Sequence, residues 1–271
     1  MIDRRQMFLG ALAGLGLSTV AGTASAMTQP FARIGVQLYT VRDAFKADPA
    51  GTLQKVRAIG YDEVETINFA NMAPADFKAM VTGAGLSAPS SHMGLADLRT
   101  RAEAAFDDIA AIGAEFAVLA WLPEEERKDW EALGAEMNGW GELARARGLT
   151  FAYHNHNFEF APLADGSIPY HLLMDNTDPA KVAFELDCYW CSFAGHDPME
   201  ILGAHGDRIR QLHLKDKTAS GDMAPVGQGV IDFPTVLAKA KDVGVKHVYV
   251  EHDNPTDPFA SITASLKYLK G

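Results

Sequence analysis

The sequence predicts an α/β protein with the (β/α)8 TIM barrel fold, forming one domain over residues 27–271. Short segments rich in β-branched and aromatic residues alternate with longer amphipathic segments along this range. There are eight short segments, and an eight-stranded barrel of this kind usually has about 250 residues. An open doubly wound sheet fits less well, because no Gly-x-Gly-x-x-Gly follows the first predicted strand.

The predicted strands are the eight short apolar segments, and the amphipathic segments between them are the predicted helices. The strands occupy residues 33–40, 61–67, 86–93, 115–122, 149–156, 181–190, 208–216 and 246–253. The helices occupy residues 48–60, 73–85, 100–113, 130–148, 197–206 and 232–244. Several helices end on a glycine directly before the next strand, as at Gly60 and Gly244, which is a common helix stop. The connection after residue 159 is the least regular, and its helix is the weakest prediction.

The first 26 residues have the pattern of an export signal. Arg4 and Arg5 precede an apolar run, and Ala24-Ser25-Ala26 ends the segment with the small residues of a cleavage site. The adjacent arginines indicate the twin-arginine type. We therefore expect a periplasmic or secreted protein with no stable membrane insertion after processing. An uncleaved amphipathic anchor is the alternative.

Composition and charge exclude one class of partner. The formal net charge is −11 and no stripe of lysine and arginine offsets it, so the surface repels polyphosphate backbones and nucleic acid is not expected as a partner. The two cysteines, Cys188 and Cys191, are spaced Cys-x-x-Cys. We expect two small buried residues or an incidental local disulfide rather than a redox pair or half a zinc site, because no second cysteine pair is present to complete a zinc site.

Chemically active side chains gather where the predicted strands end. In a (β/α)8 barrel the catalytic groups lie at the carboxyl ends of the strands. The residues found there are Gln37, Tyr39, Glu65, His92, Trp121, His154, His156, Glu159, Asp187, His213, Lys215, Glu251 and His252. Burying so many acids and imidazoles costs several kcal/mol unless they are paired or bound to metal, so this end of the barrel is the predicted active site.

Three of these residues predict a metal site. Asp187, His213 and Glu251 end three consecutive strands, which are neighbours in a barrel. With one acid added from the fifth predicted strand they form the set Glu, Asp, His and Glu, which is rich in oxygen ligands and has one imidazole. Such a set suits Mn²⁺, Mg²⁺, Co²⁺ or Zn²⁺.

Seven motifs in order resemble the xylose isomerase-like TIM barrel family, usually labelled sugar phosphate isomerase/epimerase. They are IGVQLYTVRD, GYDEVE, YHNHNFEF, FELDCYW, RIRQLHLKD, VGQGVIDFPTVL and VYVEHD, and the resemblance covers about residues 33–269. It implies one divalent metal ion, with Mn²⁺ expected first, held by Glu, Asp, His and Glu. Asp187, His213 and Glu251 match the last three. At the position of the first Glu ligand this chain has His154. We favour Glu159 as the residue that reaches the metal in its place. The alternative is that His154 or His156 replaces the carboxylate.

The His-Asn-His-Asn stretch also resembles a subgroup that contains inosose dehydratases and lyases of 3-keto-glycosides. The resemblance implies that a base removes the proton next to a metal-polarised carbonyl, with His156, Glu159, Glu251 and Lys215 as candidates. For Lys215 a surface ion pair with Asp216 is an equal alternative. The predicted substrate-binding residues are Glu65, His92, Trp121, His154 and Trp190. Trp190 occupies the position at which sugar epimerases tend to have a histidine. The resemblance therefore does not identify the substrate or the reaction.

Four functions remain as hypotheses. The first is a metal-dependent isomerase or epimerase acting on a sugar or keto-sugar, and the second is a lyase or dehydratase that eliminates a β-substituent. We expect a neutral substrate, because only Lys215 and Lys217 are basic near the GQGVIDF loop at 227–233, whose backbone amides could bind an anion. An apurinic endonuclease-like hydrolase and a non-enzymatic sugar-binding barrel are remote alternatives.

Overall fold

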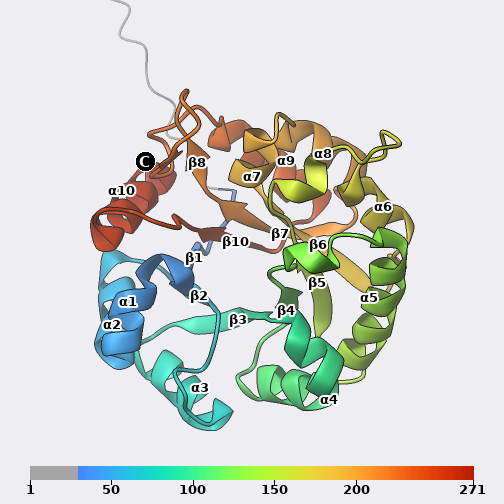
Figure 1. The fold of residues 1–271 in the computed structure, drawn as a ribbon. Coiled ribbons are helices and arrows are strands. Elements are labelled where there is room, and N and C mark those ends of the chain that lie inside the picture. Colours follow the sequence, from blue (N-terminus) through green and yellow to red (C-terminus); the bar gives the residue numbers. More distant parts are fainter. Residues whose placement is uncertain (1–29) are drawn as a thin grey trace, which may run out of the picture.

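Eight parallel strands pair edge to edge into a closed barrel in the computed structural model, which describes residues 30–271 (Figure 1). The order around the barrel is β1-β10-β7-β6-β5-β4-β3-β2. The strands are β1 (Gly35–Gln37), β2 (Glu63–Thr66), β3 (Ser87–Met93), β4 (Phe116–Leu119), β5 (Thr150–His154), β6 (Val182–Asp187), β7 (Ile209–Leu214) and β10 (His247–Val250). A short antiparallel pair, β8 (Asp216–Lys217) and β9 (Met223–Ala224), follows β7. The predicted barrel is confirmed, and the predicted signal peptide lies outside the described residues.

Helices form the outer layer around the barrel (Figure 1). They are α1 (Arg42–Ala47), α2 (Pro49–Ile59), α3 (Pro74–Gly83), α4 (Leu95–Ala111), α5 (Trp130–Arg145), α6 (Pro169–Asp175), α7 (Cys188–Phe193), α8 (Pro198–His205), α9 (Phe233–Val243) and α10 (Pro258–Lys270). An aspartate side chain caps several of them at the start, as Asp232 does by accepting a hydrogen bond from the Thr235 amide. Proline stands in the first turn of α2 and α9, where its missing N–H costs nothing.

All eight strands are shorter than their predicted segments, and in two of them a polar side chain sets the end. The predicted strand at 33–40 ends at Gln37, because its side chain accepts a hydrogen bond from the Tyr39 amide (3.1 Å) and starts a 3-10 helix, η1 (Leu38–Val41). The predicted strand at 181–190 ends at Asp187, whose carboxylate accepts a hydrogen bond from the Trp190 amide (2.8 Å) and caps α7. In both cases a polar side chain at the strand end turns the backbone.

The interior of the barrel is unusually polar. Such interiors are normally filled by bulky branched apolar side chains. Here the apolar cluster inside the barrel contains Phe116, Val118, Ala152 and Ala183, and a much larger apolar core lies between the strands and the helices. Buried charged and amide side chains fill the rest of the barrel: Gln37, Glu63, Glu65, Glu185, Gln211 and His213. The fold therefore uses its barrel axis for polar chemistry and its outer layer for hydrophobic stability.

Both cysteines lie in the interior of the protein. Cys188 and Cys191 are buried free thiols, and burial raises the pKa of both, so neither behaves as a reactive thiolate. Among residues 30–271 no helix combines the length and the apolar character needed to cross a membrane.

Candidate active site

A cavity of about 590 Å³ opens at the carboxyl ends of the barrel strands. Seven of the predicted site residues line it: His92, Trp121, His154, His156, Trp190, Lys215 and Glu251. Tyr39 and Asp253 also line it. The structure thus brings most of the predicted strand-end residues to one cavity, as expected for this fold.

His213 lies at the centre of the polar groups and contacts a different set with each ring nitrogen. Its Nδ1 is 2.8 Å from Glu251 Oε2 and 3.8 Å from Asp187 Oδ2. Its Nε2 is 2.6 Å from Glu65 Oε2 and 3.2 Å from Glu185 Oε2. Burial alone would lower the pKa of His213, but the surrounding carboxylates raise it well above its usual value.

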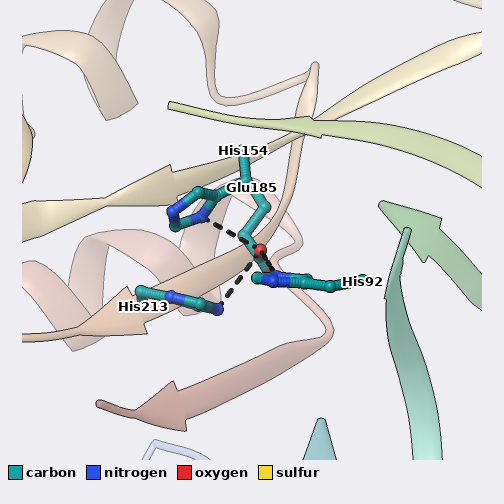
Figure 2. Close-up of side chains that lie close together, drawn as sticks. All are labelled: His92, His154, Glu185 and His213. Atoms are coloured by element: carbon teal, nitrogen blue, oxygen red, sulfur yellow. Dashed lines mark hydrogen bonds and ion pairs between the residues drawn. The ribbon is translucent and has the colours of Figure 1, made fainter. Parts of the chain in front are cut away.

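A second group of imidazoles surrounds Glu185 below the strand ends. Figure 2 shows His92, His154 and His213 directed at the carboxylate of Glu185. His92 Nε2 is 3.0 Å and His154 Nδ1 is 3.2 Å from Glu185 Oε2. His154 and Glu185 meet because they are register partners of β5 and β6, as Asp187 and His213 are of β6 and β7.

Lys215 places a buried positive charge beside the cavity. Its Nζ lies 3.1 Å from Asp187 Oδ2, 2.9 Å from Glu251 Oε2 and 2.8 Å from Asp253 Oδ1, and its side chain is only 2% exposed. Burial would lower the pKa of Lys215, but these three carboxylates raise it well above its usual value. The ammonium form is therefore the form present at neutral pH, and the alternative of a surface ion pair with Asp216 is wrong.

Asp216 has a different role. Its buried carboxylate accepts hydrogen bonds from the amides of Lys217, Gly227, Gly229 and Ile231, at 2.8–3.2 Å. Three of these amides belong to the GQGVIDF loop that was expected to offer an anion site. Because a carboxylate of the chain itself occupies them, those amides are not available to an anionic ligand.

The structure does not bring Glu159 together with Asp187, His213 and Glu251. The 3-10 turn η3 (Phe158–Phe160) directs the Glu159 carboxylate back behind the strand end. There it accepts hydrogen bonds from the Tyr153 hydroxyl (2.7 Å) and the His156 amide (2.8 Å). Burial raises the pKa of Glu159 to about 7, although these hydrogen bonds act in the opposite direction. In this position Glu159 supports the loop that carries His156.

The two histidines of the HNHN stretch have different surroundings. The His154 ring lies 4.5 Å from the His213 ring, centroid to centroid, and faces the polar groups. The His156 ring packs against Trp121 at 4.7 Å and Trp190 at 5.5 Å. Burial lowers the pKa of both imidazoles, that of His156 to about 3, so both are neutral at physiological pH.

Sequence reasoning missed two residues of the site. Glu185 precedes Asp187 by two positions, and Asp253 follows Glu251 by two. Successive side chains of a strand alternate between its faces, so residues two apart share a face. Applied to the strand that ends at Asp187, that rule would have found Glu185. Asp253 lies beyond the end of β10, where the rule no longer holds.

The residues present fit a divalent metal ion. Ligand atoms of two groups lie within 4.8 Å of one another: Asp187, His213 and Glu251, and, deeper, His92, His154, Glu185 and His213. The buried Asp187 Oδ2 has no aligned hydrogen-bond donor, although Lys215 Nζ is near. His213 turns Nδ1 to the first group while carboxylates hold Nε2, which is how proteins orient a metal-ligating histidine.

A family model describes most of the chain. Residues 53–271 match the model of the xylose isomerase-like TIM barrel. The matched range contains all of the residues in both possible metal groups. The expected resemblance is therefore confirmed at the level of the family.

Three proteins illustrate what this chain is similar to. Inosose dehydratase of Geobacillus thermodenitrificans is 27% identical over 170 residues, which cover 55% of this chain and 56% of that protein, so the chain spans about half the length of the curated relatives it matches. The structure of a sugar phosphate isomerase/epimerase from Parabacteroides distasonis superposes with a TM-score of 0.78 at 26% identity, covering 94% of this chain and 98% of the other. A xylose isomerase-like TIM barrel protein from Mycobacterium smegmatis was solved in complex with magnesium. It superposes with a TM-score of 0.68 at 16% identity, covering 91% of this chain and 97% of the other. This last likeness shows the fold alone.

Proposed function

Since the chain belongs to the xylose isomerase-like TIM barrel family, we propose that it is a divalent-metal-dependent enzyme that removes the proton next to the carbonyl of a neutral keto-sugar and expels a β-substituent. The observation that carries this proposal is the pair of groups in one cavity. The His156 imidazole and the Lys215 amine both line this cavity, and they follow different barrel strands. One group able to accept a proton and one able to donate a proton thus border the same ligand space.

Asp187, His213 through Nδ1 and Glu251 are the proposed metal ligands, and His154 belongs to the deeper group with His92 and Glu185. The ring of His154 lies next to that of His213, whereas Glu159 is turned away. Bound divalent metal polarises a carbonyl oxygen and stabilises negative charge that develops on it. Mn²⁺, Mg²⁺, Co²⁺ and Zn²⁺ all suit this set of oxygen and imidazole donors, and the Mycobacterium smegmatis relative was solved with magnesium.

The side chains of this chain account for the proton movements. His156 takes the proton from the carbon next to the carbonyl, and the C–H electron pair passes into an enolate of the substrate. These electrons then form the C=C bond as the C–O bond to the β-substituent breaks. The leaving oxygen takes its proton from the Lys215 ammonium. Asp187, Glu251 and Asp253 hold that ammonium in place, while Trp121 and Trp190 fix the plane of His156.

Isomerisation or epimerisation is the second candidate, favoured by the likeness to the Parabacteroides distasonis sugar phosphate isomerase/epimerase. In that case the proton returns to carbon and no group leaves. The inosose dehydratase relatives favour elimination. Because these likenesses point both ways, the choice rests on the acid–base pair in the cavity.

The test is a reaction in D₂O followed by NMR, with Mn²⁺-loaded protein and keto-sugars that do or do not carry a β-leaving group. We expect both kinds of keto-sugar to take up deuterium at the carbon next to the carbonyl. Only the keto-sugars that carry a β-leaving group should also release that group. Lys215→Met should slow release by ~100-fold while deuterium uptake continues, since a general acid contributes ~10²–10⁴-fold. His156→Gln should slow both. Deuterium uptake without release would make the protein an isomerase or epimerase, and the absence of both would overturn the proposal.

We also propose that the enzyme works outside the cytoplasm, as residues 1–26 predict. Mass spectrometry of the protein from a periplasmic fraction should find a mature chain that begins at Met27. A full-length chain in the cytoplasmic fraction would contradict this.

A further inference from the structure

The cavity at the top of the barrel has a charged floor and an aromatic rim. Lys215 and Glu251 at the floor are almost completely buried. At the rim, Trp121 is 50% exposed and Tyr39 is 39% exposed. Hydroxyl and carbonyl groups of a sugar match the floor, but the rim offers mainly apolar ring surface.

The rim aromatics surround the mouth of the barrel. Tyr39 follows β1, Trp121 follows β4 and Trp190 follows β6. In the closed order of strands, two strands separate β1 from β4, one separates β4 from β6, and two separate β6 from β1. A ligand that rises from the floor through the mouth therefore meets aromatic side chains on three sides.

Trp121 packs against neighbouring side chains although half of it is exposed. Its ring contacts Phe158 at 5.6 Å as well as His156, and the Arg127 guanidinium lies 5.0 Å from its centroid. Arg127 is itself fixed by donating to the Leu122 carbonyl (2.9 Å). Tyr39 is braced in a similar way by the Arg42 guanidinium at 4.2 Å. An exposed aromatic surface that is packed against its neighbours offers a flat ligand a face to stack on, and its packing reduces the cost of ordering it.

The size of the cavity indicates a ligand larger than one sugar ring. Pockets of ~300–1,000 Å³ bury most of a drug-sized ligand, and this cavity of about 590 Å³ lies well inside that range. Trp190, between floor and rim, adds a specific feature. Its buried Nε1–H has no acceptor among the described residues, so it is free to donate to an oxygen that links a sugar to a second group.

We propose that the rim is a binding subsite for a planar aromatic aglycone, so that the substrate class is aryl glycosides of a keto-sugar rather than free sugars. The floor holds the sugar, Trp190 faces the linking oxygen, and the aglycone stacks on Trp121 and Tyr39. This inference rests on the proposed function for its choice of sugar, but the subsite itself can be tested by binding alone.

The test is isothermal titration calorimetry on the purified full chain with Mn²⁺, using three unreactive probes: methyl β-glucoside, phenyl β-glucoside and methyl cellobioside. We expect phenyl β-glucoside to bind ~10-fold or more tightly than the methyl compound, because stacking adds to the burial of the ring. Trp121→Ala should reduce this preference to less than ~3-fold, and Trp121→Phe should keep most of it, since one aromatic ring replaces another.

Phe259→Ala is the matched control. Phe259 is a partly buried aromatic of α10 with the Lys55 ammonium 3.6 Å from its ring centroid, and it lies outside the cavity. Its substitution should leave the preference unchanged. A preference below tenfold in the parent protein, a preference that survives Trp121→Ala, or tighter binding of methyl cellobioside than of the phenyl compound would overturn the proposal. Deuterium exchange with a free keto-sugar reports separately on the proposed function, so the two can fail independently.

Discussion

Lys215 shows how one residue sets the electrostatics of a whole site. Its ammonium lies within 3.1 Å of three carboxylates, from Asp187, Glu251 and Asp253. Removing one partner of a buried ion pair is costly because it leaves an uncompensated charge. The sequence alone was equally consistent with Lys215 at the surface and with Lys215 in the active site. The difference is decided by the end of β7, which directs this side chain inward.

Glu159 allows a prediction for the effect of pH on stability. Burial raises the pKa of Glu159 to about 7, whereas an unfolded glutamate titrates near 4.5. The folded state therefore binds more protons between these values, and stability falls as pH rises through this window. Glu159→Gln, which resembles the protonated acid, should become more stable relative to the parent by ~1–3 kcal/mol between pH 4.5 and 8.

Urea unfolding of the parent and Glu159→Gln at pH 4.5, 6, 7 and 8 would measure this difference. Asp165→Asn is a suitable control, because Asp165 is an exposed acid whose pKa is lowered by hydrogen bonds from Ser167. A gap between parent and Glu159→Gln that stays constant across the range would show that Glu159 is ionised in the folded state throughout.

At the scale of elements, the segment after β7 is held by one carboxylate rather than by regular structure. Asp216 accepts four backbone hydrogen bonds, and three of them connect β8 to the loop before α9. Two of its donors are Gly227 and Gly229, and an added Cβ on Gly229 would lie 2.2 Å from Asp216 Oδ1. Glycine is thus required where this loop closes around the carboxylate.

Asp216→Asn should loosen this loop selectively. Hydrogen bonds to a charged group are worth ~1.5–3 kcal/mol each, and an amide replaces one accepting oxygen by a donor. We expect amide hydrogen exchange at Gly227, Gly229 and Ile231 to accelerate by at least ~10-fold, while strands β4 and β5 keep their protection. Asp222→Asn, in the same segment but exposed, should leave those amides unchanged. Equal acceleration in both variants would contradict the role of Asp216.

At the scale of the whole molecule, the barrel carries a polar axis inside an apolar shell. Glu63, His247 and Arg33 form one polar group at the amino end of the strands, where His247 Nδ1 is 2.8 Å from Glu63 Oε2. The possible metal groups lie toward the other end. Buried charges of this kind contribute little net stability by themselves, so a metal that binds only the folded barrel should stabilise it markedly.

Metal binding should therefore raise the melting temperature. At a free Mn²⁺ concentration of ~100 times the Kd, the stabilisation is ~2.7 kcal/mol, which for a domain of this size corresponds to ~5–10 °C. Differential scanning calorimetry with Mn²⁺ and with EDTA would measure the shift. Asp187→Asn and Glu251→Gln should abolish most of it. Glu63→Gln, a buried carboxylate at the opposite end, should lower both melting temperatures and keep the shift. An unchanged shift in Asp187→Asn would remove Asp187 from the ligand set.

Most of the fold could be predicted because its signals are local. Aspartate caps, glycine stops and the alternation of apolar segments predicted helices that agree with α2, α3, α5, α8 and α9 within a few residues at each end. Every predicted strand segment extended beyond the observed strand. At 33–40 and 181–190 the reason is a side chain, because Gln37 and Asp187 each cap the turn that follows. Helix α4 begins at Leu95 rather than residue 100.

The sequence by itself determined the barrel class, the end of the barrel that carries the chemistry, and the side chains present there, because these follow from periodicity along the chain. Only the tertiary structure decided which of those side chains meet. The register between β5, β6 and β7 pairs His154 with Glu185 and Asp187 with His213, and a 3-10 turn removes Glu159 from the group. Contacts between residues distant in sequence depend on closure of the barrel, and no local pattern specifies them.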